Sequence, residues 1–154
     1  MQKVYLILGF YMNFLILSLC YSLAYEFTPA DQYEISIIER LIIDSVKKKN
    51  PYVYVYSENK YKKKFFYQKI KKFAKDIKLT SKLYKADFII VLDVKKRKIS
   101  QKPALALNFE AMKYCLSCVG VFSWKNGRPN LILFENKLEK FMIKLPKEYS
   151  YFIE

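Results

Sequence analysis

The Asn126-Gly127 dipeptide, which stands between two apolar runs, is the feature that most constrains how this chain can fold. Asn and Gly readily adopt the two positive φ angles of a type I′ turn, so the stretch from Cys115 to Phe134 predicts a tight β-hairpin. A two-residue loop sets the pairing, which is Lys125 with Arg128, Trp124 with Pro129, Phe122 with Leu131, and Gly120 with Leu133. Both faces of this hairpin are apolar away from the turn, as is typical of strands inside a sheet that is covered on two sides.

The segments before the hairpin predict the helices and strands of that sheet. Thr28 to Asp31 form a helix start, with an N-cap, a proline at the first helical position and an acid three residues after the cap. Tyr52–Tyr56 and Phe88–Leu92 have the composition of strands, and the segment from residue 57 to 77 has helical spacing. We therefore predict an α/β fold for residues 25–154, a small two-layer or three-layer sandwich with a βαβ unit and a C-terminal β-hairpin in a mixed sheet.

The first residues are strongly apolar. After Lys3 the chain has no charged side chain until Glu26, and Ser22 to Ala24 form a small-x-small cleavage pattern. We interpret residues 1–24 as a cleaved secretory signal peptide, which places residues 25–154 in the periplasm or outside the cell. Two alternatives stay open, an uncleaved anchor in the inner membrane formed by residues 4–24, and a lipoprotein cleavage site at Cys20.

The formal net charge of +14 would suit polyanions or anionic lipids as partners. Only three of the 28 cationic residues are arginine, however, and lysine in excess beside Ile, Phe, Tyr and Asn is also what an AT-rich coding sequence produces. We therefore expect no nucleic acid partner, while binding to a membrane surface stays an alternative. The lysines of the 57–77 segment are interpreted as the solvated side of a helix that lies on the sheet, and they are Lys60, Lys62, Lys63, Lys64, Lys69, Lys71, Lys72 and Lys75.

Chemistry that depends on histidine is excluded, because the chain contains none. This removes Ser-His-Asp and Cys-His nucleophile systems as well as His-ligated zinc and haem. The glycines are Gly9, Gly120 and Gly127, too few for a phosphate-cradling loop, and the acidic residues are scattered rather than paired. We predict no catalytic residue, no metal site and no cofactor.

Cys115 and Cys118 form a Cys-x-x-Cys pattern. One such pair without histidine cannot complete a tetrahedral zinc site, and Leu116-Ser117 lacks the Gly or Pro that usually separates the thiols of a thioredoxin-type pair. We predict a local disulfide, with a reduced buried pair and a catalytic pair as the alternatives.

Two groups of residues are candidates for binding. The first is the hairpin tip, Trp124, Lys125 and Arg128, where the arginine fork could hold a carboxylate or phosphate, or where the cations are simply solvated. The second group follows predicted strands, and ligands in open α/β sheets bind at such carboxyl ends. Its members are Ser57 with Glu58, Asp93 and Asn108, which could instead only cap helices and end strands.

The C-terminal pattern V-G-x-F-x-W-K-x-G-R-P, followed by L-x-K-F-x-I-x-L-P, resembles a group of small secreted bacterial proteins of uncharacterised function. The layout of the mature chain is more distantly similar to periplasmic regulators of the YfiR type, which share a leading helix, a strand-helix-strand unit and a late hairpin with a basic turn. The Asn50-Pro51 pair stands where that family tends to carry a tryptophan-proline element. This resemblance implies a periplasmic domain that restrains a membrane-bound signalling protein.

These observations predict a secreted or periplasmic domain without enzymatic activity, which binds or regulates a membrane-bound or periplasmic protein. A thiol-disulfide redox protein that uses Cys115 and Cys118 is one alternative. A basic protein that binds polyanions or a membrane surface is the other.

Overall fold

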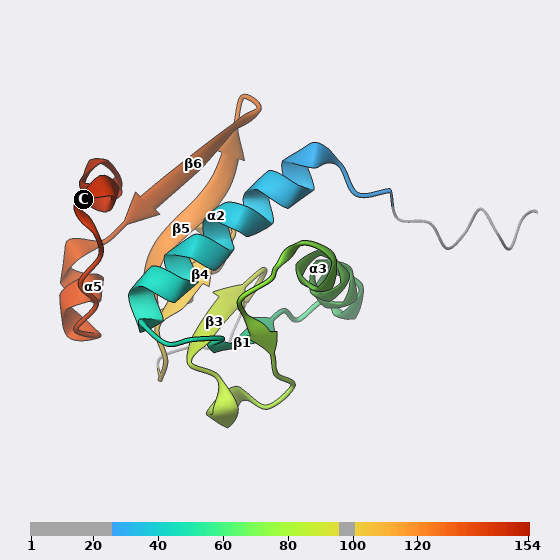
Figure 1. The fold of residues 1–154 in the computed structure, drawn as a ribbon, viewed down its shortest axis with the longest axis horizontal. Helices are drawn as coiled ribbons and strands as arrows, with labels where there is room; N and C mark the ends of the chain where they lie inside the picture. Colours follow the sequence, from blue (N-terminus) through green and yellow to red (C-terminus); the bar gives the residue numbers. More distant parts are fainter. Residues whose placement is uncertain (1–25, 96–100) are drawn as a thin grey trace, which may run out of the picture.

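The computed structural model of the protein describes residues 26–95 and 101–154 (Figure 1). The strands are β1 (Tyr52–Tyr56), β2 (Lys78–Leu79), β3 (Phe88–Val91), β4 (Ala104–Ala106), β5 (Cys118–Lys125) and β6 (Arg128–Leu133). The helices are α2 (Pro29–Val46), α3 (Lys60–Phe73), α4 (Phe109–Lys113) and α5 (Glu135–Lys140), with 3-10 turns η1 (Leu83–Lys85) and η2 (Lys147–Phe152). The signal peptide or anchor predicted within residues 1–24, and Cys20, lie outside the described residues.

The strands form one mixed sheet in the order β2-β1-β3-β4-β5-β6. Neighbouring strands from β2 to β5 are parallel, and β6 runs antiparallel to β5. The predicted α/β fold with a C-terminal hairpin is therefore confirmed. Because β2 and β3 lie on opposite sides of β1, the order reverses at β1, and the carboxyl ends of β1 and β3 lie next to each other.

The hairpin has the predicted register. Lys125 pairs with Arg128 and Gly120 with Leu133, and the turn residues Asn126 and Gly127 have φ angles of 51° and 73°. Glycine is required at position 120, because a β-carbon there would collide with the Ile132 carbonyl oxygen on β6. Turn chemistry and side-chain alternation are local properties, which is why the sequence predicted this element correctly.

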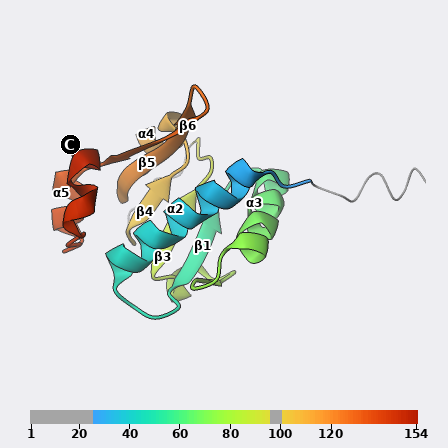
Figure 2. The same ribbon diagram turned by 45° about the horizontal axis from the view of Figure 1, so that its top comes forward.

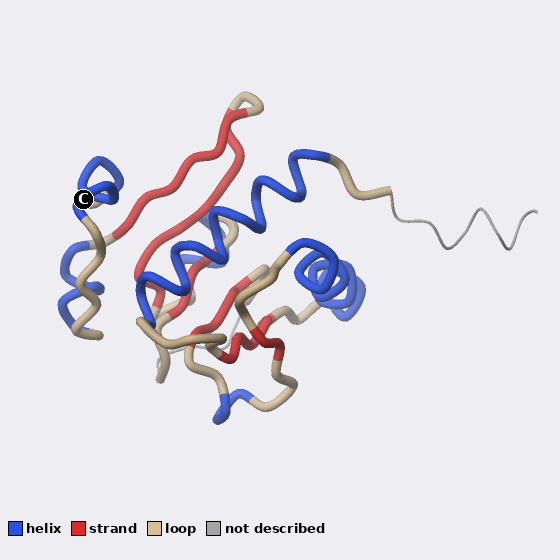
Figure 3. The backbone as a smooth tube through the Cα atoms, viewed as in Figure 1, coloured by secondary structure: helices blue, strands red, loops and turns tan. Residues whose placement is uncertain are grey.

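The two faces of the sheet carry two cores of unequal size. On the larger one, α2, α3, α5 and η2 cover the apolar side chains of the strands. Figures 1 and 2 show α2 lying diagonally across the sheet, with α3 on one flank and the hairpin with the C-terminal helices on the other. In Figure 3 the strands run behind α2. The opposite face has a thinner cover that includes α4 and the Cys115–Cys118 segment, packed on Ile89, Val91, Ala104, Ala106 and Val121.

Helix α2 begins where the sequence predicts. The Thr28 hydroxyl accepts a hydrogen bond from the Asp31 backbone N–H, and the Asp31 carboxylate accepts one from the Thr28 backbone N–H at 2.7 Å, which completes a capping box. The helix buries one apolar stripe, Ile35, Ile38, Leu41 and Ile42. Among the helices of residues 26–95 and 101–154, none is long and apolar enough to cross a bilayer.

Helix α3 departs from the prediction at Lys69. This residue was assigned to the solvated side, but it is buried, and its Nζ lies 2.6 Å from both Asp31 Oδ1 and Glu34 Oε2 of α2. The reason is its position three residues after Phe66, at the border of the apolar stripe where α2 packs against α3. Burial alone would lower the pKa of Lys69, but hydrogen bonds from the ammonium to the two carboxylates outweigh it and raise that pKa.

Candidate functional site

The structure brings the predicted strand-end residues Ser57 and Asp93 together. The Asp93 carboxylate accepts hydrogen bonds from the Ser57 hydroxyl at 2.9 Å and from the Glu58 backbone N–H at 2.7 Å, and Lys62 Nζ lies 3.8 Å away. Asn59, rather than Ser57, is the N-cap of α3. Asp93 therefore occupies the place in front of α3 where an external anion would otherwise sit.

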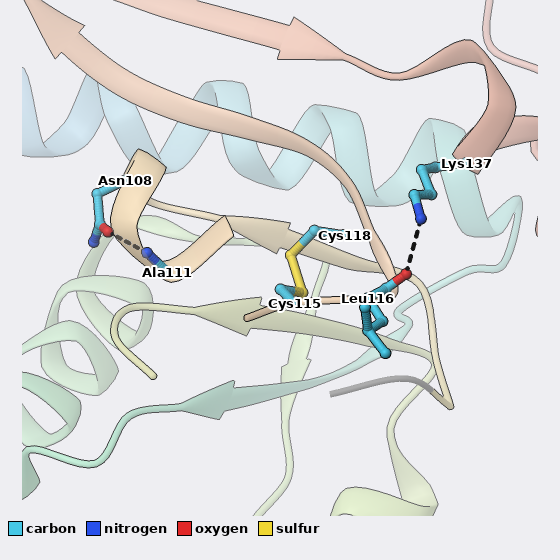
Figure 4. The surroundings of a disulfide bond; sticks show 6 residues. All are labelled: Asn108, Ala111, Cys115, Leu116, Cys118 and Lys137. Carbon is cyan, nitrogen blue, oxygen red and sulfur yellow. Dashed lines mark hydrogen bonds between the residues drawn. A yellow bond between two sulfur atoms is a disulfide. The ribbon is translucent and has the colours of Figure 1, made fainter. Parts of the chain in front are cut away.

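Asn108 lies at the same end of the sheet and is also satisfied internally. Its side-chain amide donates to the Leu92 carbonyl oxygen at 2.6 Å and accepts from the Ala111 backbone N–H at 2.7 Å, which caps α4 (Figure 4). The strand-end residues thus gather at one edge, as parallel strands require, but their polar atoms bind one another and the backbone. These hydrogen bonds terminate strands and cap helices, and they occupy the polar atoms that a ligand would need.

The predicted disulfide joins Cys115 and Cys118, whose Cα atoms are 5.4 Å apart (Figure 4). It closes the turn between α4 and β5, and Lys137 of α5 donates to the Leu116 carbonyl oxygen of this turn at 3.3 Å. Cys115 is 5% exposed and Cys118 is 2% exposed. Thiol-disulfide exchange requires a thiolate to reach one of the sulfurs, and both are covered here.

The hairpin tip presents an aromatic side chain and two cations. Trp124 is 39% exposed and packs edge-to-face on Phe122, with ring centroids 6.1 Å apart. Lys125 and Arg128 are exposed and face each other across the pair of strands. In residues 26–95 and 101–154, neither cation has an acidic partner within 4.0 Å. Like charges directly opposite one another are unfavourable, so this pair would gain from a bound anion.

A groove with a volume of about 530 Å³ runs from the hairpin to the C-terminal segment, between β5–β6, α2 and η2. We call it the hairpin groove. Its volume lies in the range of small-ligand and anchor-residue pockets. The apolar side chains that line it are Tyr33, Ile37, Phe122, Pro129, Leu131 and Phe152. The sequence did not reveal it, because its walls come from segments far apart in the chain; the only signal was the aromatic C-terminal segment.

The end of the hairpin groove away from the tip is held by a polar network. The Tyr149 hydroxyl donates to Asp44 Oδ2 at 2.8 Å, and Arg40 Nε donates to the same oxygen at 2.9 Å. Arg40 also lies 3.7 Å from Glu148. Burial and the hydrogen bond to Asp44 raise the pKa of Tyr149 well above its usual value, so its hydroxyl stays a donor. The network attaches η2 to α2 and keeps this wall in place.

The described residues hold no group of three or more Cys, Asp or Glu side chains that could bind a metal ion. No family model and no curated protein matches the chain. Among solved structures, the chain is similar to a conserved domain protein from Vibrio cholerae O1 biovar El Tor, with a TM-score of 0.48 and 9% sequence identity over 83% of this chain. The chain spans 60% of that protein's length, and a likeness at this level identifies neither a family nor an activity.

Proposed function

We propose that this protein is a binding or regulatory domain without enzymatic activity, which works outside the cytoplasm and contacts a membrane-bound or periplasmic protein through the hairpin groove and tip. The observation that carries the proposal is an open apolar groove, one of whose lining residues, Phe122, packs against Trp124 at the hairpin tip, beside the unneutralised pair Lys125 and Arg128. The strand-end polar groups and the disulfide, by contrast, are engaged within the fold.

The surface has the anatomy of a protein interface. Interfaces gain most of their binding energy from a few aromatic or arginine residues that fit into apolar pockets, surrounded by polar groups. Trp124 stands over Phe122, which lines the hairpin groove, and the two cations stand at the adjacent turn. The partner segment expected from this chemistry carries a large apolar side chain for the groove and a carboxylate for Lys125 and Arg128.

The location outside the cytoplasm is supported by two features. The apolar segment over residues 1–24 is typical of a signal peptide or an anchor, and a buried disulfide persists in oxidising compartments. The resemblance to periplasmic regulators of the YfiR type agrees with a partner in the inner membrane. Fractionation of cells that express the chain would test this part of the proposal, because recovery of the domain in the cytosol contradicts it.

The binding surface is tested by capture from the membrane and periplasmic fractions of the native host, with quantitative mass spectrometry. Trp124→Ala should weaken recovery of the specific partner by roughly 30-fold, the effect of losing an interface residue worth about 2 kcal/mol. The double variant Lys125→Ala with Arg128→Ala should also weaken it. Lys49→Ala with Lys78→Ala removes the same charge from exposed positions away from the hairpin and should change nothing. Equal recovery of every envelope protein by all four proteins would overturn the proposal.

A further inference from the structure

A second surface, independent of the hairpin groove, lies on the outer side of α3. The helix has no acidic residue between Lys60 and Phe73. Lys60, Lys64 and Lys71 are exposed, and at 100° per residue they fall within about 40° of one another around the helix axis. We call these three residues the lysine row. It extends for about 16 Å along the helix, from the rise of 1.5 Å per residue.

The lysine row is not neutralised by the rest of the described fold. None of its three lysines has an ion pair within 4.0 Å in residues 26–95 and 101–154. The acids that contact α3 bind groups outside the lysine row, and one of them is Asp93, which lies 3.8 Å from Lys62 Nζ. Asp31 and Glu34 bind Lys69, and the Glu39 carboxylate accepts the backbone N–H groups of Lys75 and Asp76 at 2.7 and 2.6 Å. Those acids bind α3 and its C-terminal end to α2, and the outer side of the helix keeps its positive charge.

The segment that leads into α2 lies beside this helix. Phe27 stacks on Phe65 with ring centroids 5.5 Å apart and meets Phe73 edge-on at 5.7 Å, both on α3. Tyr61, next to Lys60 in the chain, is 83% exposed, and tyrosine favours the boundary between water and lipid. In sequence, the apolar segment over residues 4–24 ends three positions before Phe27, so an anchor formed by it would tether the chain close to Phe27 and the helix that Phe27 contacts.

We infer that the lysine row holds this domain against an anionic phospholipid surface. Charge complementarity requires a polyanion, and the exposed tyrosine and the position of Phe27 favour lipid over nucleic acid. Helix α3 and the hairpin lie on opposite flanks of α2 (Figures 1 and 2), and the groove is lined from the hairpin, α2 and η2. A domain that rests on lipid through α3 therefore leaves the groove open to a protein partner.

Co-sedimentation with vesicles tests this inference on residues 25–154, which contain every residue of both hydrophobic cores. The domain should bind vesicles of equal parts phosphatidylglycerol and phosphatidylcholine, and not vesicles of phosphatidylcholine alone, and raised salt should weaken the binding. Lys60→Gln, Lys64→Gln and Lys71→Gln together should lower the partition coefficient by roughly 100-fold, since each lysine near an anionic surface contributes about a factor of 5.

The matched control combines Lys49→Gln, Lys144→Gln and Lys147→Gln, which removes the same charge from exposed lysines outside α3. It should retain nearly all vesicle binding. Equal losses in the two triple variants would overturn the inference, because net charge rather than the row would then be responsible. It would also fail if the α3 variant bound as the wild type does, or if duplex DNA at the same phosphate concentration displaced the domain from the vesicles. Circular dichroism of each variant establishes that the fold is intact.

Discussion

Lys69 on α3 donates a 2.6 Å hydrogen bond to the Glu34 carboxylate on α2, and both side chains are nearly removed from solvent. Asp31 lies at the same distance from the ammonium, so one lysine holds two carboxylates that are one helical turn apart. The same Asp31 completes the capping box of α2. A single buried cation on α3 is therefore joined to the first turns of α2.

Replacement of this cation should cost more stability than replacement of any exposed lysine of the helix. We expect Lys69→Met to lower the free energy of unfolding by about 3 kcal/mol, because it leaves two carboxylates near each other without their partner. Lys64→Met, on the exposed side of the same helix, should change it by less than about 0.5 kcal/mol. Urea unfolding monitored by circular dichroism measures both values, and similar values for the two variants would show that the buried cluster contributes little.

The same cluster predicts a loss of stability in acid. Burial raises the pKa of Asp31, but hydrogen bonds from Lys69 and Thr28 outweigh it and hold that pKa below the usual value. The pKa of Asp87 is lowered in the same way: burial raises it, but hydrogen bonds from the Tyr52 backbone N–H and from Lys48 outweigh burial. A carboxylate with a lowered pKa contributes stability that is present above its unfolded value of about 3.9 and is lost as the pH falls through the folded value.

We therefore expect the free energy of unfolding of the wild type to decrease as the pH falls below about 4. The decrease should be smaller in Asp31→Asn with Asp87→Asn, which is already less stable at neutral pH. Urea titrations at a series of pH values provide the comparison. An acid dependence identical in the wild type and the double variant would contradict this assignment.

The disulfide should support stability rather than binding. The disulfide closes a loop of four residues. For a loop of this length, the chain-entropy relation predicts that Cys115→Ala with Cys118→Ala lowers the free energy of unfolding by about 2 kcal/mol. Capture of the protein partner should not change, because neither cysteine lines the hairpin groove. The reduction of insulin by the wild-type protein above background, lost in the double variant, would instead reveal a redox activity.

Two glycines of the hairpin should respond differently to alanine. Gly120→Ala places a β-carbon against the Ile132 carbonyl oxygen at the end of the strand pair away from the turn, and we expect it to lower the free energy of unfolding by about 2 to 3 kcal/mol with displacement of β6. In Gly127→Ala the new β-carbon contacts no neighbouring atom, so only the backbone at φ 73° is strained. We expect this strain to lower the free energy of unfolding by about 1 kcal/mol. Thermal unfolding should rank the variants in this order. The opposite order would contradict the close approach of β5 and β6 at Gly120.

The elements that the sequence predicted well are those whose cause is local. The positive φ angles of Asn126 and Gly127 set the register of the hairpin, and Thr28 with Asp31 set the start of α2. The edge of the sheet at which Ser57, Asp93 and Asn108 lie was also predictable, because parallel strands end on the same side. The sequence could not predict whether those side chains are open to a ligand, because that depends on which neighbours satisfy their hydrogen bonds.

The sequence by itself determined the alternation of apolar and polar residues, the turns and the caps, since each of these depends on residues within a few positions of one another. Only the tertiary structure decided that Lys69 is buried, that Asp93 fills the position in front of α3, and that Tyr33, Phe122 and Phe152 form one groove. Each of these outcomes brings together segments 30 or more residues apart along the chain. Such contacts depend on how the strands pair and on how α2 packs across the sheet, and no short stretch of sequence specifies either.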